Sequence, residues 1–187
     1  MIEFSFAFTT SLVILGWIVF RICANRRRGS FSWKREAVQL LFLINLAVIS
    51  RMVFHPMETD NGQIMPLVFD AATAWPFRIN LIPFVYLFDY ETTRSMWLNV
   101  IGNAAMFIPT GILTPLLYKH LDSLKKTVLT GFLISLTIEI LQLPFAVRAS
   151  DVDDLILNTA GCLAGYGILR LVRFLKQVCF IHSQQKQ

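Results

Sequence analysis

Apolar residues in this chain are gathered into long runs, and clusters of basic residues separate the runs. A helix of about 20 apolar residues crosses a bilayer core of about 30 Å, and the runs here are about 18–21 residues long. Hydrophobic residues make up 55% of the chain and charged residues only 16%, whereas soluble domains hold about 25% charged residues. The sequence therefore predicts an integral membrane protein rather than a soluble domain with a large core.

Five runs are predicted to be membrane-spanning helices. They cover residues 4–23, 37–54, 98–118, 127–147 and 155–173. Lys and Arg cluster after the first, third and fifth runs, and the positive-inside bias places such connections in the cytoplasm. We therefore expect one domain over residues 1–187, an all-α polytopic bundle of about five transmembrane helices. Its N-terminus is expected outside and its C-terminus inside.

The connection between the second and third runs is long and rich in proline and aromatic residues. It covers about residues 55–96 and contains Pro56, Pro66, Pro76 and Pro83, so it is too interrupted for another span. Aromatic rings favour the membrane–water interface. We expect an extracytoplasmic interfacial or re-entrant element, with an unstructured loop as the alternative.

Polar residues recur at helical spacing within three of the apolar runs. Residues three and four apart share one helix face, which groups Ser135, Glu139 and Gln142 in the fourth run, Asp151, Asp154 and Asn158 in the fifth, and Asn99 and Asn103 in the third. Polar and ionisable groups inside a membrane bundle usually face its interior and indicate a functional site. The three faces therefore predict a polar pocket near the outer ends of these helices. Pro109 is expected to interrupt the third run, either widening this pocket or only disturbing packing.

Glu139 is the strongest candidate in this set. A carboxylate at a helix centre costs about 2.5–3.5 kcal/mol even on a lenient insertion scale, so a role beyond packing is expected. Gln142, Asn103 and Arg148 are its candidate partners, and Arg148 is also close in sequence to three aspartates. For Asp151 or Asp153 the alternative is a helix N-terminal cap. For Asn103 and Asn158 it is hydrogen bonding between helices without chemistry.

Other site classes are not indicated. Cys23, Cys162 and Cys179 have no repeated spacing, so neither a disulfide framework nor a zinc motif follows from them. No metal site and no cofactor are expected. The net charge of +5 comes from basic residues at the ends of the apolar runs, which membrane topology explains without a nucleic-acid partner.

Several short motifs occur in a defined order. They are Asn80–Phe84 (NLIPF), Asn99–Asn103 (NVIGN), Phe107–Gly111 (FIPTG), Glu139–Gln142 (EILQ) and Arg148–Gly161 (RASDVDDLILNTAG). With this order, the stretch from about Val53 to Gly167 resembles the VanZ-like family of bacterial membrane proteins. The resemblance implies a multi-pass protein of the bacterial cytoplasmic membrane and an association with resistance to the lipoglycopeptide teicoplanin more than to vancomycin. The matching polar positions are Asn80, Asn99, Asn103, Glu139, Gln142, Arg148, Asp151, Asp154 and Asn158.

Four kinds of activity remain open, one of which is a scaffold that modulates an envelope enzyme and does no chemistry itself. As a binding protein, the chain would hold an undecaprenyl-linked cell-wall precursor or a lipoglycopeptide, with Arg148 pairing an anionic group. As an enzyme on an envelope lipid, it would use Glu139 and Asp154 as general acid and base. As a proton-coupled transporter or flippase, it would titrate Glu139. Membrane lipids are the expected partners in each case, and a homo-oligomer is a further alternative.

Overall fold

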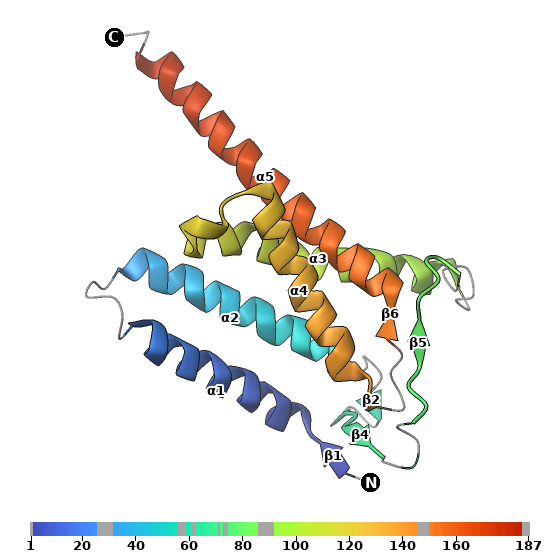
Figure 1. Cartoon of the computed structure of the whole chain (residues 1–187). Helices are drawn as coiled ribbons and strands as arrows, with labels where there is room; N and C mark the ends of the chain where they lie inside the picture. Colours follow the sequence, from blue (N-terminus) through green and yellow to red (C-terminus); the bar gives the residue numbers. More distant parts are fainter. Residues whose placement is uncertain are drawn as a thin grey trace.

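The computed structural model is a bundle of long helices with short strands at one end (Figure 1). It describes residues 2–25, 32–55, 59–60, 63–70, 72, 75–85, 92–145 and 150–184. The helices are α1 (Phe6–Asn25), α2 (Trp33–Phe54), α3 (Thr93–Leu117), α4 (Leu124–Gln142) and α5 (Val152–Gln184), with a 3-10 turn at Lys119–Leu121 between α3 and α4. Five helices and no closed sheet in the described part confirm the predicted all-α membrane fold.

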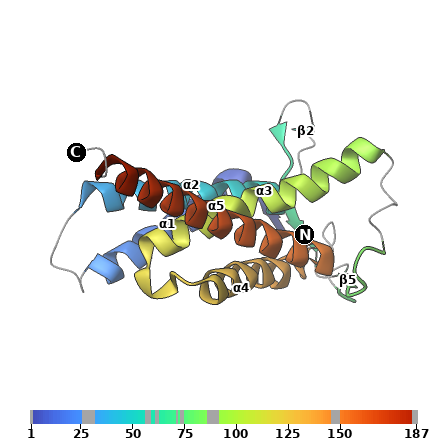
Figure 2. The ribbon, with the colours of Figure 1, turned by 90° about the horizontal axis from the view of Figure 1, so that it is seen from above.

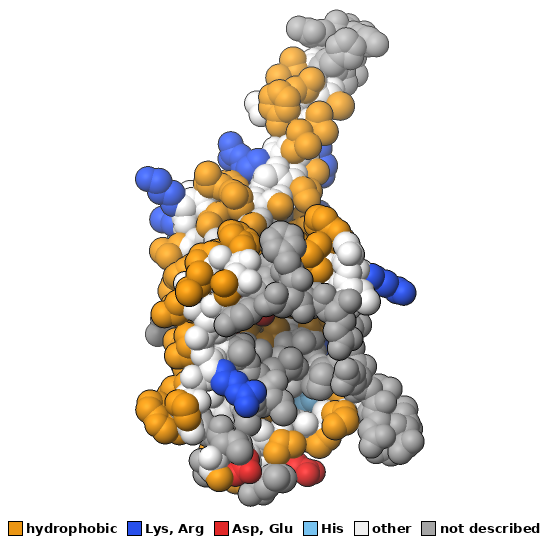
Figure 3. All heavy atoms as spheres, turned by 90° about the vertical axis from the view of Figure 1, so that its right-hand side faces the viewer, with side chains coloured by type: hydrophobic (Ala, Val, Ile, Leu, Met, Phe, Trp, Pro, Cys, Tyr) orange, Lys and Arg blue, Asp and Glu red, His pale blue; other side chains and the backbone are white. Residues whose placement is uncertain are grey.

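Four of the described helices, α1, α2, α3 and α5, are long and apolar enough to cross a membrane. The exception, α4, is shorter and carries Lys125, Lys126 and Glu139. Large hydrophobic side chains are exposed along the helices, and on the face shown in Figure 3 they lie along one flank and over the C-terminal part of α5. The exposed ones include Leu12 on α1 and Leu41 on α2. These features are those of a multi-pass membrane protein.

The helix ends differ from the predicted spans for local chemical reasons. Helix α3 begins at Thr93 rather than at residue 98, because the Thr92 side chain accepts a hydrogen bond from the Ser95 N–H and caps the helix. Helix α4 ends at Gln142 rather than at residue 147, and Pro144, which has no N–H to donate, lies two residues further on. Helix α5 continues to Gln184, well past residue 173, because no glycine or proline follows Gly167.

The prediction that Pro109 interrupts its helix is wrong. Helix α3 is continuous through Pro109 and Pro115. Pro109 leaves the carbonyl of Ala105, four residues before it, without its helical donor, and the Met106 carbonyl next to it is the one that α2 reaches. In this turn Asn45 of α2 donates from Nδ2 to the Met106 carbonyl at 2.8 Å and accepts from Thr110 Oγ1 at 2.7 Å. Hydrogen bonds from a neighbouring helix therefore support α3 where proline weakens it.

The short strands gather at one end of the bundle (Figure 1). Strand β1 (Ile2–Phe4) pairs antiparallel with β4 (Leu67–Phe69), and β2 (Thr59–Asp60) pairs with β3 (Gln63–Ile64). Strand β5 (Ile79–Asn80) pairs parallel with β6 (Ser150–Asp151), which directly precedes α5. Within the segment after α2, residues 59–60, 63–64, 67–69 and 79–80 thus form paired strands. Their location relative to the membrane stays a prediction.

Helices α3 and α5 approach each other closely through glycines. A Cβ added at Gly161 would lie 2.0 Å from the Ala104 carbonyl oxygen, and one at Gly165 would lie 2.1 Å from the Ile108 carbonyl oxygen. Small residues permit this backbone-to-backbone distance between membrane helices. The contact fixes the relative position of the two helices that carry Asn103 and Asp154. In contrast, α1 is mostly exposed and packs mainly on α2 (Figures 1 and 2).

Candidate functional site

A polar pocket of about 110 Å³ lies between α2, α3, α4 and α5. The described residues that line it are Met52, Val53, Asn99, Asn103, Ile138, Glu139, Gln142, Asp154 and Asn158. The structure thus brings together polar residues from all three predicted helix faces. The helical spacing in each run places them on the same side, and the close contact between α3 and α5 aligns two of the faces.

Glu139 is buried in the pocket wall, with 5% of its surface exposed. Its Oε2 accepts a hydrogen bond from Ser150 Oγ at 2.9 Å and another from the Asp151 N–H at 3.0 Å. Both donors precede α5, and the sequence did not identify Ser150. Two donors on one oxygen hold the carboxylate in a fixed orientation, which offsets part of its burial cost.

The side chains predicted to be partners of Glu139 have other hydrogen bonds. Gln142 donates from Nε2 to the Val53 carbonyl at 3.1 Å, which ties α4 to the end of α2. Asn103 donates to the Asp154 carboxylate and, at 3.4 Å, to Asn99 Oδ1. Arg148 lies outside the described residues. Gln142 and Asn103 therefore shape the pocket by fixing neighbouring groups.

Asn158 presents an unsatisfied acceptor in the pocket wall. Its side chain is only 2% exposed, and Nδ2 donates to Ser135 Oγ on α4 at 2.9 Å. No donor among the described residues reaches its buried Oδ1. A buried carbonyl oxygen without a donor costs about 1–3 kcal/mol. A bound water or ligand group that donates a hydrogen bond there would remove this cost.

Asn80 and Asp151 are not among the described residues that line the pocket; they support it from the β5–β6 pair. Asn80 donates from Nδ2 to Asp151 Oδ1 at 3.1 Å. The same oxygen accepts from the Asp153 N–H at 2.9 Å, so Asp151 acts as the N-terminal cap of α5, the structural alternative for this residue. The cap positions the Asp151 N–H that binds Glu139.

A second supporting contact involves Asp153, which the sequence analysis considered only as a cap or as a neighbour of Arg148, and Phe84, which it did not select. Asp153 is 7% exposed and its Oδ1 accepts from the Phe84 N–H at 2.8 Å. Phe84 has a φ of 62°, in the left-handed region that non-glycine residues seldom adopt. The contact attaches the segment after β5 to the first turn of α5. Asp153 could have been selected from its charge at a helix start, but its partner is distant in sequence.

The pocket favours ligand groups that donate hydrogen bonds. Among the described lining residues, Glu139 and Asp154 are acidic and none is Lys, Arg or His. The open Asn158 oxygen adds a further acceptor. No group of three or more His, Cys, Asp or Glu within the described part of the chain could hold a metal ion. A hydroxyl, an amide N–H or an ammonium group matches this set of acceptors.

Comparison with known proteins places the chain in a family. Residues 38–173 match the VanZ/LLP1 family, which is more than half of the chain. A segment of 93 residues is 36% identical to "Protein VanZ" of Enterococcus faecium and covers 48% of this chain and 53% of that protein. The match thus spans about half the length of this relative. No solved structure matches the chain. The extent of the family match, which includes all of α3 and α4 and most of α2, shows that the chain belongs to the VanZ/LLP1 family.

Proposed function

We propose that the polar pocket binds a hydrogen-bond-donating group of a cell-envelope lipid, a peptidoglycan precursor or a lipoglycopeptide. The observation that carries the proposal is the unsatisfied Asn158 Oδ1 in a cavity that also contains Glu139 and Asp154. Asn158 Oδ1 is an acceptor that no described donor reaches, and Glu139 and Asp154 add carboxylate oxygens to the same cavity wall. A ligand donor therefore fits the pocket chemically.

The volume of the pocket limits what enters it. A water molecule takes about 30 Å³ in the liquid, and the pocket measures about 110 Å³. One terminal group, such as a sugar hydroxymethyl or a peptide amine, fits there, whereas a whole disaccharide or drug does not. The remainder of the ligand would lie outside the pocket, toward the β5–β6 end of the bundle.

The resemblance to VanZ-like proteins gives this proposal a physiological direction. Such proteins are associated with teicoplanin resistance, so the candidate ligands are the drug, a precursor that the drug recognises and the envelope lipid that carries this precursor. Protection against teicoplanin more than against vancomycin is the expected phenotype. The lipid tail of teicoplanin would add contact with the apolar surface of the bundle.

Susceptibility tests address the proposed function in cells. Wild type, Glu139→Gln and Glu3→Gln are compared in a susceptible Gram-positive host at matched membrane abundance. Glu139→Gln keeps the shape and an acceptor oxygen but removes the charge, and Glu3→Gln makes the same change at an exposed strand residue. We expect selective protection by wild type and by Glu3→Gln, and loss of protection with Glu139→Gln. Equal protection by all three would show that Glu139 has only a structural role.

Binding of the purified protein provides a direct test. Lipid II, undecaprenyl phosphate and teicoplanin are titrated separately against wild type and Glu139→Gln. A lost charged hydrogen bond is worth about 1.5–3 kcal/mol, so the affinity for the true ligand should fall on the order of 10- to 100-fold. Absence of saturable binding to all three compounds would refute the proposed binding function.

A second candidate function is catalysis, because both Glu139 and Asp154 line the same pocket. Paired carboxylates can act as general acid and base when their surroundings separate their proton affinities. Release of a product from lipid II, abolished by Glu139→Gln, would favour an enzyme. Intact lipid II after prolonged incubation with protein that binds it would favour the binding function.

A further inference from the structure

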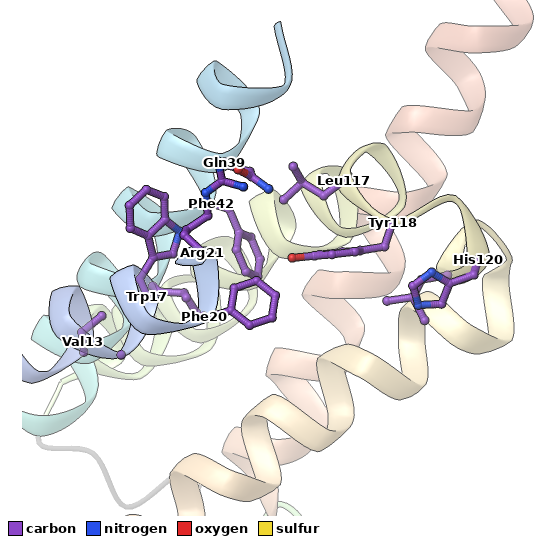
Figure 4. A pocket seen from close by; sticks show the side chains of 12 residues that line it. Val13, Trp17, Phe20, Arg21, Gln39, Phe42, Leu117, Tyr118 and His120 are labelled. Carbon is purple, nitrogen blue, oxygen red and sulfur yellow. The ribbon is translucent and has the colours of Figure 1, made fainter. Parts of the chain in front are cut away.

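A larger cleft lies away from the polar pocket, between α1, α2 and the end of α3 (Figure 4). Its volume is about 670 Å³, within the range typical of small-molecule sites. The described lining residues are Val13, Gly16, Trp17, Phe20, Arg21, Gln39, Phe42, Leu46, Leu117, Tyr118, His120 and Leu121. Most of them are apolar or aromatic, so the cleft matches a hydrocarbon chain.

Of two polar side chains in the cleft, Arg21 has an ion-pair partner and Gln39 has an unsatisfied acceptor. Arg21 is 8% exposed, is paired with Glu36 and lies over the Trp17 ring at 5.8 Å from the ring centroid. Gln39 is 3% exposed, and no donor among the described residues reaches its buried Oε1. Figure 4 shows Arg21 and Gln39 on one side of the cleft. The unsatisfied Gln39 oxygen calls for a donor such as a hydroxyl.

A basic pocket of about 490 Å³ adjoins this cleft. It shares Leu117, Tyr118 and His120 with the cleft, and Lys34, Arg35 and Lys119 also line it. No acidic residue is among its described lining residues. The buried Nε of Arg35 has no acceptor among the described residues. Because an unpaired guanidinium nitrogen prefers an anionic oxygen, the basic pocket matches a phosphate.

We propose that the cleft and the basic pocket together bind one molecule of phosphatidylglycerol. The phosphate would lie near Arg35 and Lys119, and an acyl chain would lie along the aromatic wall of the cleft. A head-group hydroxyl would donate to Gln39, which is one helical turn from Arg35 on the same face of α2. Basic pockets between membrane helices bind anionic lipid head groups in this way.

The charge of the basic pocket sets the expected lipid preference. Each Lys or Arg near an anionic lipid contributes roughly fivefold in affinity, and three of them on the order of 100-fold. Phosphatidylglycerol should therefore bind much more tightly than phosphatidylcholine, which is zwitterionic and has no head-group hydroxyl. Inorganic phosphate has the charge but not the chain, and it should not compete.

The chain offers matched variants for both halves of the site. Arg35→Gln combined with Lys119→Gln removes two charges from the basic pocket, and Lys125→Gln is the control at an exposed lysine outside both cavities. Gly16→Leu fills the cleft at a position where an added Cβ meets nothing within 4 Å. Gly167→Leu is its control, because Gly167 on α5 is equally open and lines neither cavity.

The test is native mass spectrometry of the purified chain in a neutral detergent, titrated with phosphatidylglycerol, phosphatidylcholine or inorganic phosphate. We expect one saturable phosphatidylglycerol molecule per chain. The double variant should weaken it by about 25-fold, Gly16→Leu should abolish it, and both controls should bind like wild type. Size-exclusion profiles confirm that each variant is folded.

Three results would overturn the proposal. Equal binding of phosphatidylglycerol and phosphatidylcholine would show that the charges of the basic pocket do not select the lipid. Competition by inorganic phosphate would indicate a site for a free anion. Binding by Gly16→Leu equal to that by Gly167→Leu would exclude the cleft. None of these results depends on the polar pocket, since it shares no described lining residue with the cleft or with the basic pocket.

Discussion

Replacing Gly161 with alanine should destabilise the protein strongly. The added Cβ would lie 2.0 Å from the Ala104 carbonyl oxygen and 3.0 Å from the Ala104 Cα. Non-bonded heavy atoms prefer separations of about 3.5–4.0 Å, so α3 and α5 would have to separate by roughly 1 Å or more. Both colliding groups belong to the backbone, which means that no change of rotamer can relieve the contact.

Because the backbone collision cannot be relieved by a side-chain rotation, the loss of folding free energy should be large. Overpacking in a core usually costs about 1–3 kcal/mol, and a collision between backbone groups should reach the upper end. For a chain of this size, about 1 kcal/mol shifts the melting temperature by about 2–4 °C. Gly161→Ala should therefore lower the melting temperature by about 6–12 °C.

Gly167→Ala is the matched control on the same helix. A Cβ at Gly167 meets nothing within 4 Å, and alanine is favoured over glycine in a helix interior by about 1 kcal/mol. This variant should melt at or slightly above the wild-type temperature. Thermal unfolding in detergent, followed by the loss of the monodisperse size-exclusion peak, measures both variants. If Gly161→Ala melts at or above the temperature of Gly167→Ala, the close α3–α5 contact is refuted.

Two further stability changes can be measured in the same assay. Asn45→Ala removes the hydrogen bonds to the Met106 carbonyl and from Thr110 Oγ1, and it should cost about 1–2 kcal/mol; a melting temperature equal to wild type would contradict the support of α3 beside its proline. Asp122→Asn weakens the ion pair in which Arg173 Nη1 donates to both Asp122 oxygens. These side chains are 27% and 37% exposed, so the loss should stay below about 1 kcal/mol; a larger loss than that of Asn45→Ala would be evidence against this ranking.

The helical parts of the site could be predicted because side chains three and four residues apart lie on the same face of a helix. A spacing of three and four residues places Ser135, Glu139 and Gln142 on one face of α4, and all three are buried. Asn158 occupies the matching face of α5 and binds Ser135. Burial of polar groups in a membrane bundle follows from their cost in lipid, which leaves the bundle interior as their location.

The partners of these residues could not be predicted from spacing. Glu139 binds Ser150 and the Asp151 N–H, whose positions depend on the parallel pairing of β5 with β6. That pairing joins Asn80 to Asp151, far apart in the sequence. Strands of two residues have no detectable alternation, so neither the pairing nor the donors to Glu139 follow from a local pattern.

The close contact between α3 and α5 stabilises the bundle and also positions the polar pocket. A variant at this contact can therefore change both stability and ligand binding. Gly161 lies about one turn beyond Asn158 on α5, and its partner Ala104 is next to Asn103 on α3. Separating these helices would displace the two asparagines, so Gly161→Ala should lose ligand binding without any change in pocket chemistry. Glu139→Gln retains an acceptor oxygen for Ser150 and for the Asp151 N–H, so its melting temperature should stay close to that of wild type. Loss of binding without loss of stability would therefore assign a role to the Glu139 charge itself, whereas loss of both would indicate only that the pocket wall had moved.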